Sequence, residues 1–238
     1  MALTVTVLVA AACGGASFAA PSPDQGLVVK QSVPNVPLTA ANGQTLRFSD
    51  FRGKYVVLAP FLTLCQDECP LITGAYFAME RDVKAAGLGN RVEFVTVSVD
   101  PWRDTPARDA AFERRFGANW LMLTGSQSTL EQFWGPFGVF FESVPEDDHA
   151  LRDWWTGRPL TIEVLHTDGY ILIDPKGRER FINSNAPNVP SLSPNLKALL
   201  DRGGLRHYEH PLPTAWTVGD AVASLEWLTG RNIPQLGD

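Results

Sequence analysis

The sequence predicts an α/β fold with a mixed central β-sheet flanked by helices. Residues 55–62 and 92–99 are nearly unbroken apolar runs, and each is followed by a segment with helical spacing of its apolar residues. Strands buried on both faces that alternate with helices are typical of sheets covered by helices. The 18 Pro and 20 Gly favour short elements with many turns and argue against a helical bundle.

The composition is that of a globular chain with an acidic balance. Hydrophobic residues make up 45% and charged residues 19% of the 238 residues, which excludes a disordered chain and a coiled coil. The 20 Lys and Arg against 26 Asp and Glu give a net charge of −6, and the basic residues form no extended run. A phosphate backbone would find no basic patch to bind, so we expect no nucleic-acid partner.

The first 20 residues have the character of an export leader. They are uncharged, and their apolar centre, 2–12, is too short to span a bilayer, although the usual positive opening segment is missing. The sequence around Cys13 resembles a bacterial lipobox, which would anchor the protein by lipid on the outer face of the cytoplasmic membrane. Alternatively, cleavage near Ala19 or Ala20 removes Cys13 and releases the protein into the periplasm. Both interpretations predict an exported protein, membrane-associated through its N-terminus in the first case.

Three regions are expected after the leader of residues 1–20. Residues 21–36 have little periodicity and predict a tether. Residues 37–202 carry the elements of one domain, and residues 203–238 form a C-terminal extension with an amphipathic helix. That helix is expected to be capped by Thr217 and to share one apolar face among Val218, Ala221, Val222, Leu225 and Leu228.

The order of elements follows from turn signals, apolar runs and helix caps. Asn42-Gly43 is typical of a tight turn and predicts an N-terminal hairpin. Gly87 ends the first helix, and Thr105, followed by Pro106, caps the second. In the first half of the domain we expect a hairpin around 41–43, a strand over 55–62, a helix over 70–86, a strand over 92–99 and a helix over 106–116.

The second half combines short elements with an irregular insertion. Ser128 and Glu131 have capping-box spacing, and Gly135-Pro136 must end the helix that they begin. Residues 145–159 are polar and acidic and are expected to form a loop insertion. The remaining expected elements are a strand over 120–123, an extended segment over 139–144, a hairpin of 169–174 and 178–183, and a helix over 191–201.

Two cysteines lie where a central strand ends and the next helix begins. Cys65 and Cys69 are the only cysteines after the leader, too few and too close to form a disulfide scaffold. A spacing of four places both sulfurs on one face of a helical turn, and nearby helix amides favour thiolate over thiol. The pair could hold a soft metal or form a reversible disulfide; two buried structural thiols are the alternative.

Three segments together resemble the Sco/SenC family of exported, thioredoxin-fold copper proteins. The first is Cys65–Pro70, which follows a buried strand. The second is Ser98–Pro106, continued by Phe116-Gly117 and Leu123–Ser126. The third is His166, shortly before Tyr170–Arg178. The similarity extends over about 37–200 and implies a thioredoxin-like fold.

The resemblance implies a metal site formed by Cys65, Cys69 and His166. In thioredoxin-fold relatives the loop before the last hairpin carries a cis-proline facing the cysteines, so a histidine there would point at the sulfurs. Two thiolates and an imidazole suit Cu(I), and with water or a carbonyl they can hold Cu(II), whereas zinc prefers a fourth ligand. Taken alone, His166 would more simply be a structural or surface histidine. The chain departs from the family at Gln66, where Pro is usual, and at 167–169.

Two functions fit these residues. The resemblance implies a copper metallochaperone for the copper-bearing subunit of cytochrome c oxidase, which holds a binuclear copper centre. The dithiol also fits a thiol-disulfide oxidoreductase, acting on that subunit or another exported copper or thiol protein, in which Cys65 attacks and Cys69 resolves. A peroxiredoxin-type peroxidase is disfavoured because Thr63-Leu64-Cys65 lacks the Thr-x-x-Cys spacing.

Several other polar residues have an expected place. His207 and His210 could share a metal if their segment were helical, but Pro211 and Pro213 predict a solvated loop instead. His149, in the acidic insertion, is expected to be exposed. Asp104 and Thr105 are expected to cap a helix, with Asp100 as a candidate supporting residue near the site. Asp67 and Glu68 could tune the cysteines or contact a partner, and the sequence leaves both roles open.

Overall fold

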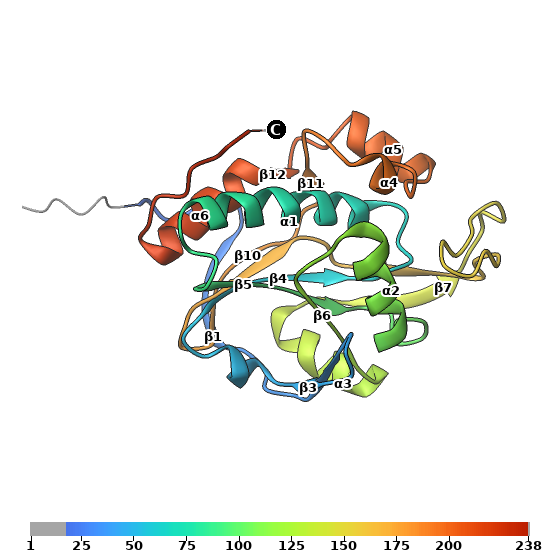
Figure 1. Cartoon of the computed structure of the whole chain (residues 1–238), viewed down its shortest axis with the longest axis horizontal. Coiled ribbons are helices and arrows are strands. Elements are labelled where there is room, and N and C mark those ends of the chain that lie inside the picture. Colours follow the sequence, from blue (N-terminus) through green and yellow to red (C-terminus); the bar gives the residue numbers. More distant parts are fainter. Residues whose placement is uncertain (1–17, 238) are drawn as a thin grey trace, which may run out of the picture.

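An eight-stranded sheet forms the centre of the structure, a computed structural model that describes residues 18–237 (Figure 1). In order across the sheet, the strands are β1 (Leu27–Ser32), β10 (Arg178–Asn183), β9 (Tyr170–Ile173), β4 (Tyr55–Phe61), β5 (Val92–Ser98), β6 (Leu121–Thr124), β2 (Leu38–Ala40) and β3 (Thr45–Leu46). Strands β4, β5 and β6 run parallel, and every other neighbouring pair is antiparallel. The sheet is therefore mixed, as the sequence predicts.

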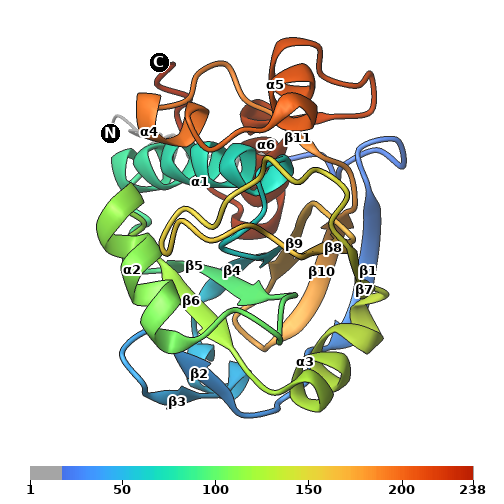
Figure 2. The same ribbon diagram turned by 90° about the vertical axis from the view of Figure 1, so that its right-hand side faces the viewer.

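The parallel centre explains where the helices must lie. Strands β4 and β5 pair in register from Tyr55 opposite Val92 to Phe61 opposite Ser98. Parallel neighbours need a crossover connection, which α1 (Glu68–Ala85) provides between β4 and β5 and α2 (Pro106–Phe116) between β5 and β6. Helices α1 and α6 (Val218–Thr229) cover one face of the sheet, and α3 (Gln127–Trp134) lies on the opposite side (Figures 1 and 2).

The helix caps agree with the sequence at Thr105 and Thr217 and differ at the start of α3. Thr105 accepts from the backbone N–H of Arg108, and Thr217 forms a capping box with Asp220. Helix α3 begins earlier than expected, because Ser126 rather than Ser128 is its N-cap. Two 3-10 turns, η1 (Phe48–Phe51) and η2 (Gly135–Phe137), follow the N-terminal hairpin and α3.

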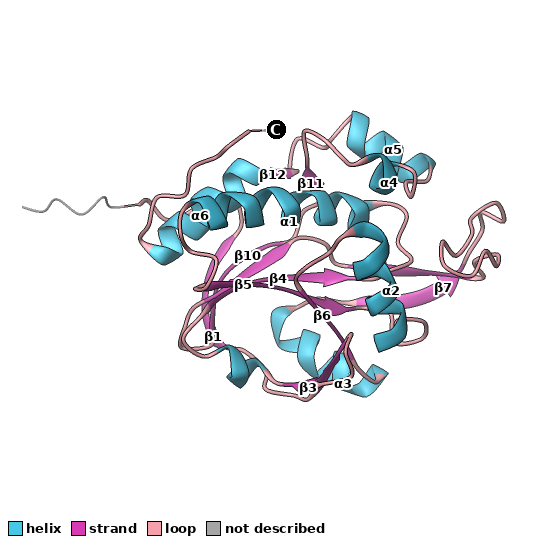
Figure 3. Ribbon diagram, in the orientation of Figure 1, coloured by secondary structure: helices cyan, strands magenta, loops and turns pink. Residues whose placement is uncertain are grey.

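A two-stranded ribbon stands apart from the main sheet. Strands β7 (Phe141–Pro145) and β8 (Ile162–His166) pair antiparallel, and the predicted insertion joins them as a long loop (Figure 3). Within the insertion, Arg152 and Pro159 form an isolated antiparallel β-bridge. The sequence predicts the extended segment that becomes β7 but not β8, which pairs with β7.

Two predictions near the chain ends are wrong. Residues 27–32, expected within the tether, form β1 against β10, because pairing of an edge strand depends on backbone groups rather than on an apolar pattern. The segment expected as a loop around His207 and His210 is helix α5 (Arg202–Glu209), with Asp201 as N-cap. Pro211 lies just beyond its C-cap, His210, where proline ends a helix without disturbing it.

The C-terminal extension packs back onto the domain. The predicted helix over 191–201 is reduced to α4 (Pro194–Lys197). Strand β12 (Trp216–Thr217) pairs parallel with β11 (Pro187–Asn188), and buried Trp216 contacts Tyr170 with ring centroids 4.8 Å apart. Among residues 18–237 we find no helix of the length and apolarity that a bilayer crossing requires. The predicted leader and Cys13 lie outside the described residues, apart from the last three leader positions.

Candidate metal and redox site

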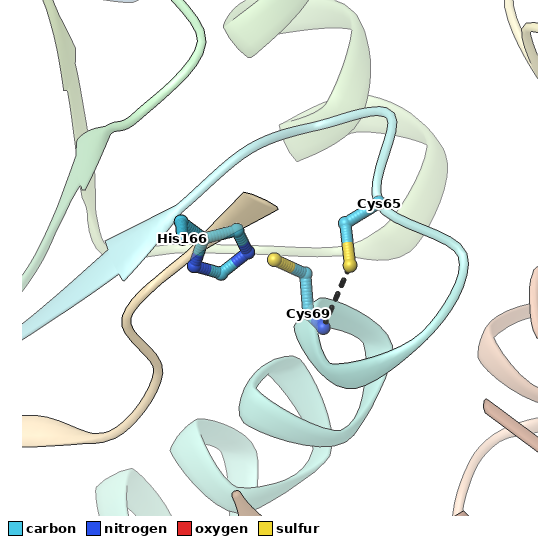
Figure 4. Close-up of side chains that lie close together, drawn as sticks. All are labelled: Cys65, Cys69 and His166. Carbon is cyan, nitrogen blue, oxygen red and sulfur yellow. Dashed lines mark hydrogen bonds between the residues drawn. The ribbon is translucent and has the colours of Figure 1, made fainter. Parts of the chain in front are cut away.

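The cysteine pair lies at the start of α1, beyond the end of β4. Cys65 is in the connecting loop and Cys69 in the first helical turn, because α1 begins at Glu68, two residues before the predicted start at Pro70. The first backbone N–H groups of a helix have no partner within it. The N–H of Cys69 uses this freedom to donate to Sγ of Cys65 at 3.4 Å (Figure 4). Both residues are free cysteines, Cys69 buried and Cys65 half-buried.

His166, the last residue of β8, lies beside the two cysteine sulfurs (Figure 4). Its Nδ1 lies 3.0 Å from the carbonyl oxygen of Thr167 and 3.6 Å from Oδ1 of Asp168. Gly169, with φ of +104°, makes the turn into β9; a Cβ there would lie 1.8 Å from the carbonyl oxygen of Asn183. Residues 167–169 thus form the tight turn behind the histidine. No cis peptide occurs in residues 18–237.

The three predicted ligands converge. One donor atom from each of Cys65, Cys69 and His166 lies within 4.8 Å of the other two (Figure 4). Two sulfurs and an imidazole nitrogen make a donor set that suits a soft metal ion. The two sulfurs are also placed to exchange with a disulfide. The residues present therefore fit both uses that the sequence left open.

Electrostatics favour a thiolate at Cys65 facing a charged imidazole. The side-chain hydrogen bond with Cys69 lowers the pKa of the Cys65 thiol well below its usual value, against the effect of burial; His166 lowers it further, and the Cys69 backbone N–H adds the smallest contribution. Burial opposes charge on His166, but the hydrogen bond to Cys65 and the carboxylate of Asp168 outweigh it and raise the pKa of His166 to about 9. The two groups stabilise each other's charged form.

Cys69 behaves in the opposite way. Burial raises the pKa of the Cys69 thiol well above its usual value, and the neighbouring Cys65 raises it further. The site therefore combines a reactive thiolate at Cys65 with a protonated thiol at Cys69. Such an asymmetry is typical of a pair in which one sulfur attacks and the other resolves.

An acidic cavity of about 210 Å³ opens beside the sulfurs. Its carboxylates come from Asp67, Glu68, Glu146, Glu163, Asp168 and Asp201. Burial, together with neighbouring negative charge, raises the pKa of Glu68 to about 9 and that of Asp168 to about 6. Glu68 then keeps its proton at neutral pH, but the other carboxylates outnumber Arg103 and His166 in the lining, so the cavity favours cations over anionic ligands.

Buried polar contacts hold the strand ends beneath the site. Asp104 accepts from the Thr63 hydroxyl at 2.6 Å and the Ser98 hydroxyl at 2.7 Å, so it ties the ends of β4 and β5 together. The expectation that Asp104 caps a helix is wrong; Thr105 alone is the cap. Asp100 binds Arg103, whose Nη1 donates to the carbonyl oxygen of Ile162 at 2.6 Å.

The sequence assigns Arg103 and His207 no role at the site. Arg103 links the segment after β5 to the first residue of β8, and its only signal was its place within the Ser98–Pro106 match. His207, expected in a solvated loop, lies 2.7 Å from Oδ1 of Asp67 and 2.9 Å from Oε1 of Glu68. His149 is exposed as predicted, and His210 is exposed at the C-cap of the helix that carries His207.

The fold and the site define a class of protein. A mixed sheet whose central strand leads into a helix through a cysteine pair, with a histidine facing that pair, is a thioredoxin-like protein with a thiol and soft-metal site. The SCO1/SenC family model matches residues 30–200. The chain belongs to the SCO1/SenC family.

Relatives and solved structures agree with this assignment. The mitochondrial protein SCO2 homolog of Bos taurus is 31% identical over 121 residues, 51% of this chain and 45% of its own length. The solution structure of apo Sco1 from Thermus thermophilus has 26% identity and a TM-score of 0.55, covering 71% of this chain and 90% of that one. Bradyrhizobium japonicum ScoI with copper bound shares the fold, with 24% identity and a TM-score of 0.53, over 70% of this chain and 96% of its own. The chain spans about half the length of the curated relatives it matches.

Proposed function

We propose that this protein is an exported copper metallochaperone that assists copper insertion into the binuclear copper centre of cytochrome c oxidase. The observation that carries the proposal is the convergence of Cys65, Cys69 and His166 within 4.8 Å. Family membership supplies the expected target, the copper-bearing subunit of the oxidase. Copper is the cargo in this function, and the chain's residues receive and release it.

The donor set favours copper over other common metals. Cu(I) is satisfied by two thiolates and an imidazole, and Cu(II) accepts the same donors with an added oxygen. Structural zinc sites have four protein ligands, and the described residues place only one donor atom from each of three residues here. The copper-bound Bradyrhizobium japonicum relative supports this choice.

Cys65, Cys69 and His166 have different roles in metal capture. The Cys65 sulfur is already favoured as a thiolate and is the natural first donor. Cys69 keeps its proton until a metal arrives, because only a cation compensates its buried charge, so metal binding releases that proton. His166 completes the set, and the carboxylates around the cavity attract the incoming cation.

The asymmetry of the two cysteines supports a second candidate, a thiol-disulfide oxidoreductase. The Cys65 thiolate would attack a target disulfide and form a mixed disulfide, which Cys69 would then resolve. The target leaves with two thiols, and this chain retains the Cys65–Cys69 disulfide. Two electrons and two protons pass to the target, so a separate thiol reductant must restore the pair.

Metal content of the purified protein separates the two candidates. The chain is produced with copper supply, purified in the reduced state and analysed for copper by elemental analysis, with Cys65→Ser/Cys69→Ser as the control. Stoichiometric copper in the native chain and none in the control supports the chaperone. A native chain that remains free of copper while its cysteines cycle normally contradicts the chaperone and favours the reductase.

A further inference from the structure

We infer that His207 is a positioning residue for the cysteine pair: it holds the Asp67 carboxylate away from the start of α1, so that the Cys69 N–H is available to Cys65. The inference deepens the proposed function, since it concerns the same two sulfurs, but its test measures thiol chemistry rather than copper. His207 belongs to α5, beyond the end of the family match at residue 200.

Asp67 is the N-cap residue of α1 but does not cap it. An aspartate at this position normally accepts a hydrogen bond from the second or third backbone N–H of its helix. In α1 the second residue is Cys69 and the third is Pro70, which has no N–H, so Cys69 is the one ordinary donor. The Asp67 side chain makes no cap hydrogen bond, and the Cys69 N–H donates to Sγ of Cys65 instead.

The carboxylate of Asp67 is occupied by His207. Nδ1 of His207 donates to Oδ1 of Asp67 at 2.7 Å, and the same nitrogen lies 2.9 Å from Oε1 of Glu68. Two acceptors, the Asp67 carboxylate and the Cys65 sulfur, therefore compete for one N–H, and His207 removes the stronger competitor. Without it, we expect Asp67 to return to its usual capping position.

The backbone of α5 brings His207 to this place. The N–H of Asp201 donates to the carbonyl oxygen of Gln66 at 2.8 Å. A Cβ on Gly204 would lie 2.6 Å from that oxygen and 2.9 Å from Cα of Asp67, so only glycine allows the helix to approach so closely. Asp201 and Gly204 thus seat the first turn of α5 on the loop between the cysteines.

A redox titration tests the competition. Losing the hydrogen bond from the Cys69 N–H destabilises the reduced sulfur of Cys65. It does not destabilise the disulfide, in which that sulfur carries no charge. We expect His207→Ala to shift the equilibrium with glutathione toward the Cys65–Cys69 disulfide by about fivefold. His207→Gln keeps an N–H donor for Asp67 and should stay close to the native value. His210→Ala, an exposed histidine on the C-cap of the same helix, is the matched control.

The decisive comparison repeats His207→Ala in an Asp67→Ala background. Without a carboxylate to compete, removing His207 should no longer shift the glutathione equilibrium, so the two substitutions are strongly non-additive. An equal shift in both backgrounds would mean that His207 acts on the cysteines independently of Asp67 and would overturn the inference. No shift in either background would overturn it as well. Copper content, measured separately, reports on the proposed function independently of these outcomes.

Discussion

The guanidinium of Arg108 forms a bidentate ion pair with the carboxylate of Asp153, with N–O distances of 3.0 and 2.8 Å. Arg108 belongs to α2 and Asp153 to the insertion between β7 and β8, and both side chains are buried. The same carboxylate accepts from the backbone N–H groups of Trp155 and Thr156. This pair fixes the insertion to the domain.

The Arg108–Asp153 pair should be important for stability. Asp153→Ala leaves the Arg108 charge buried without its partner, and we expect the free energy of unfolding to fall by about 3 kcal/mol at pH 7. Urea unfolding measures this, with Asp147→Ala at an exposed position of the insertion as the control. A loss no larger than that of the control would show that the pair contributes nothing.

Acid should weaken the same contact. Burial opposes the charge of Asp153, but the hydrogen bonds from Arg108 and its other donors outweigh burial and hold the pKa of Asp153 well below its usual value. A lowered folded pKa stabilises the fold above the unfolded pKa of about 4, and this contribution disappears as the pH falls further. In Asp153→Ala, that part of the acid sensitivity should be absent.

Asp109 should give the stability of the fold the opposite pH dependence. Burial, with Asp104 and Glu113 nearby, raises its pKa to about 9, and its Oδ2 has no hydrogen-bond partner among the described residues. The folded chain then binds this proton more tightly than the unfolded chain, so its contribution to stability falls as the pH rises from about 4 to about 9. Asp109→Asn should flatten that slope in urea unfolding at pH 5 and 8. A parallel slope in the variant would refute the assignment.

The two cysteines should differ in reactivity while forming one disulfide. At neutral pH iodoacetamide should modify Cys65 well before Cys69, because the Cys65 thiol has the lowered pKa and is the more exposed. Mass spectrometry of the modified peptides measures the order. Graded redox buffers should also give a two-proton change confined to the peptide that contains both cysteines. Equal labelling rates, or cysteines that stay reduced throughout, would contradict this prediction.

His166 should matter more for copper than for thiol chemistry. His166→Ala removes one of three proposed ligands, so copper binding should weaken, Cu(II) most of all, while the disulfide still forms. Cells carrying the variant should lose oxidase assembly at limiting copper if the chain is a chaperone. Oxidase activity and a thiol assay on the purified variant provide the two measurements. Full oxidase activity would favour the reductase.

Cys13 should determine membrane attachment if it carries a lipid. Cys13→Ser should then release the protein from the membrane fraction, because bacterial lipoproteins are retained by more than one acyl chain. Cell fractionation followed by immunodetection measures the release. Unchanged membrane association would instead point to attachment through the leader itself.

Much of the site was predictable because its parts are local or carried by the family resemblance. Cys65 and Cys69 are only four residues apart, so their spacing alone indicates that the sulfurs lie close together, although Cys65 lies in the loop before α1 rather than in a helical turn. His166 has no such local signal, and only the resemblance assigned it to the sulfurs. His207 was missed because Pro211 was interpreted as breaking the helix, whereas it follows the helix end.

The sequence by itself determined the alternation of buried strands and helices, the N-terminal hairpin and the position of the cysteine pair. These features depend on residues a few positions apart, whose spacing sets the backbone periodicity. The tertiary structure alone decided that β1 completes the sheet, that Arg108 meets Asp153, and that His207 takes the Asp67 carboxylate. Those contacts join distant segments, and they depend on strand order and on how closely backbones can approach, as at Gly204, which no local pattern encodes.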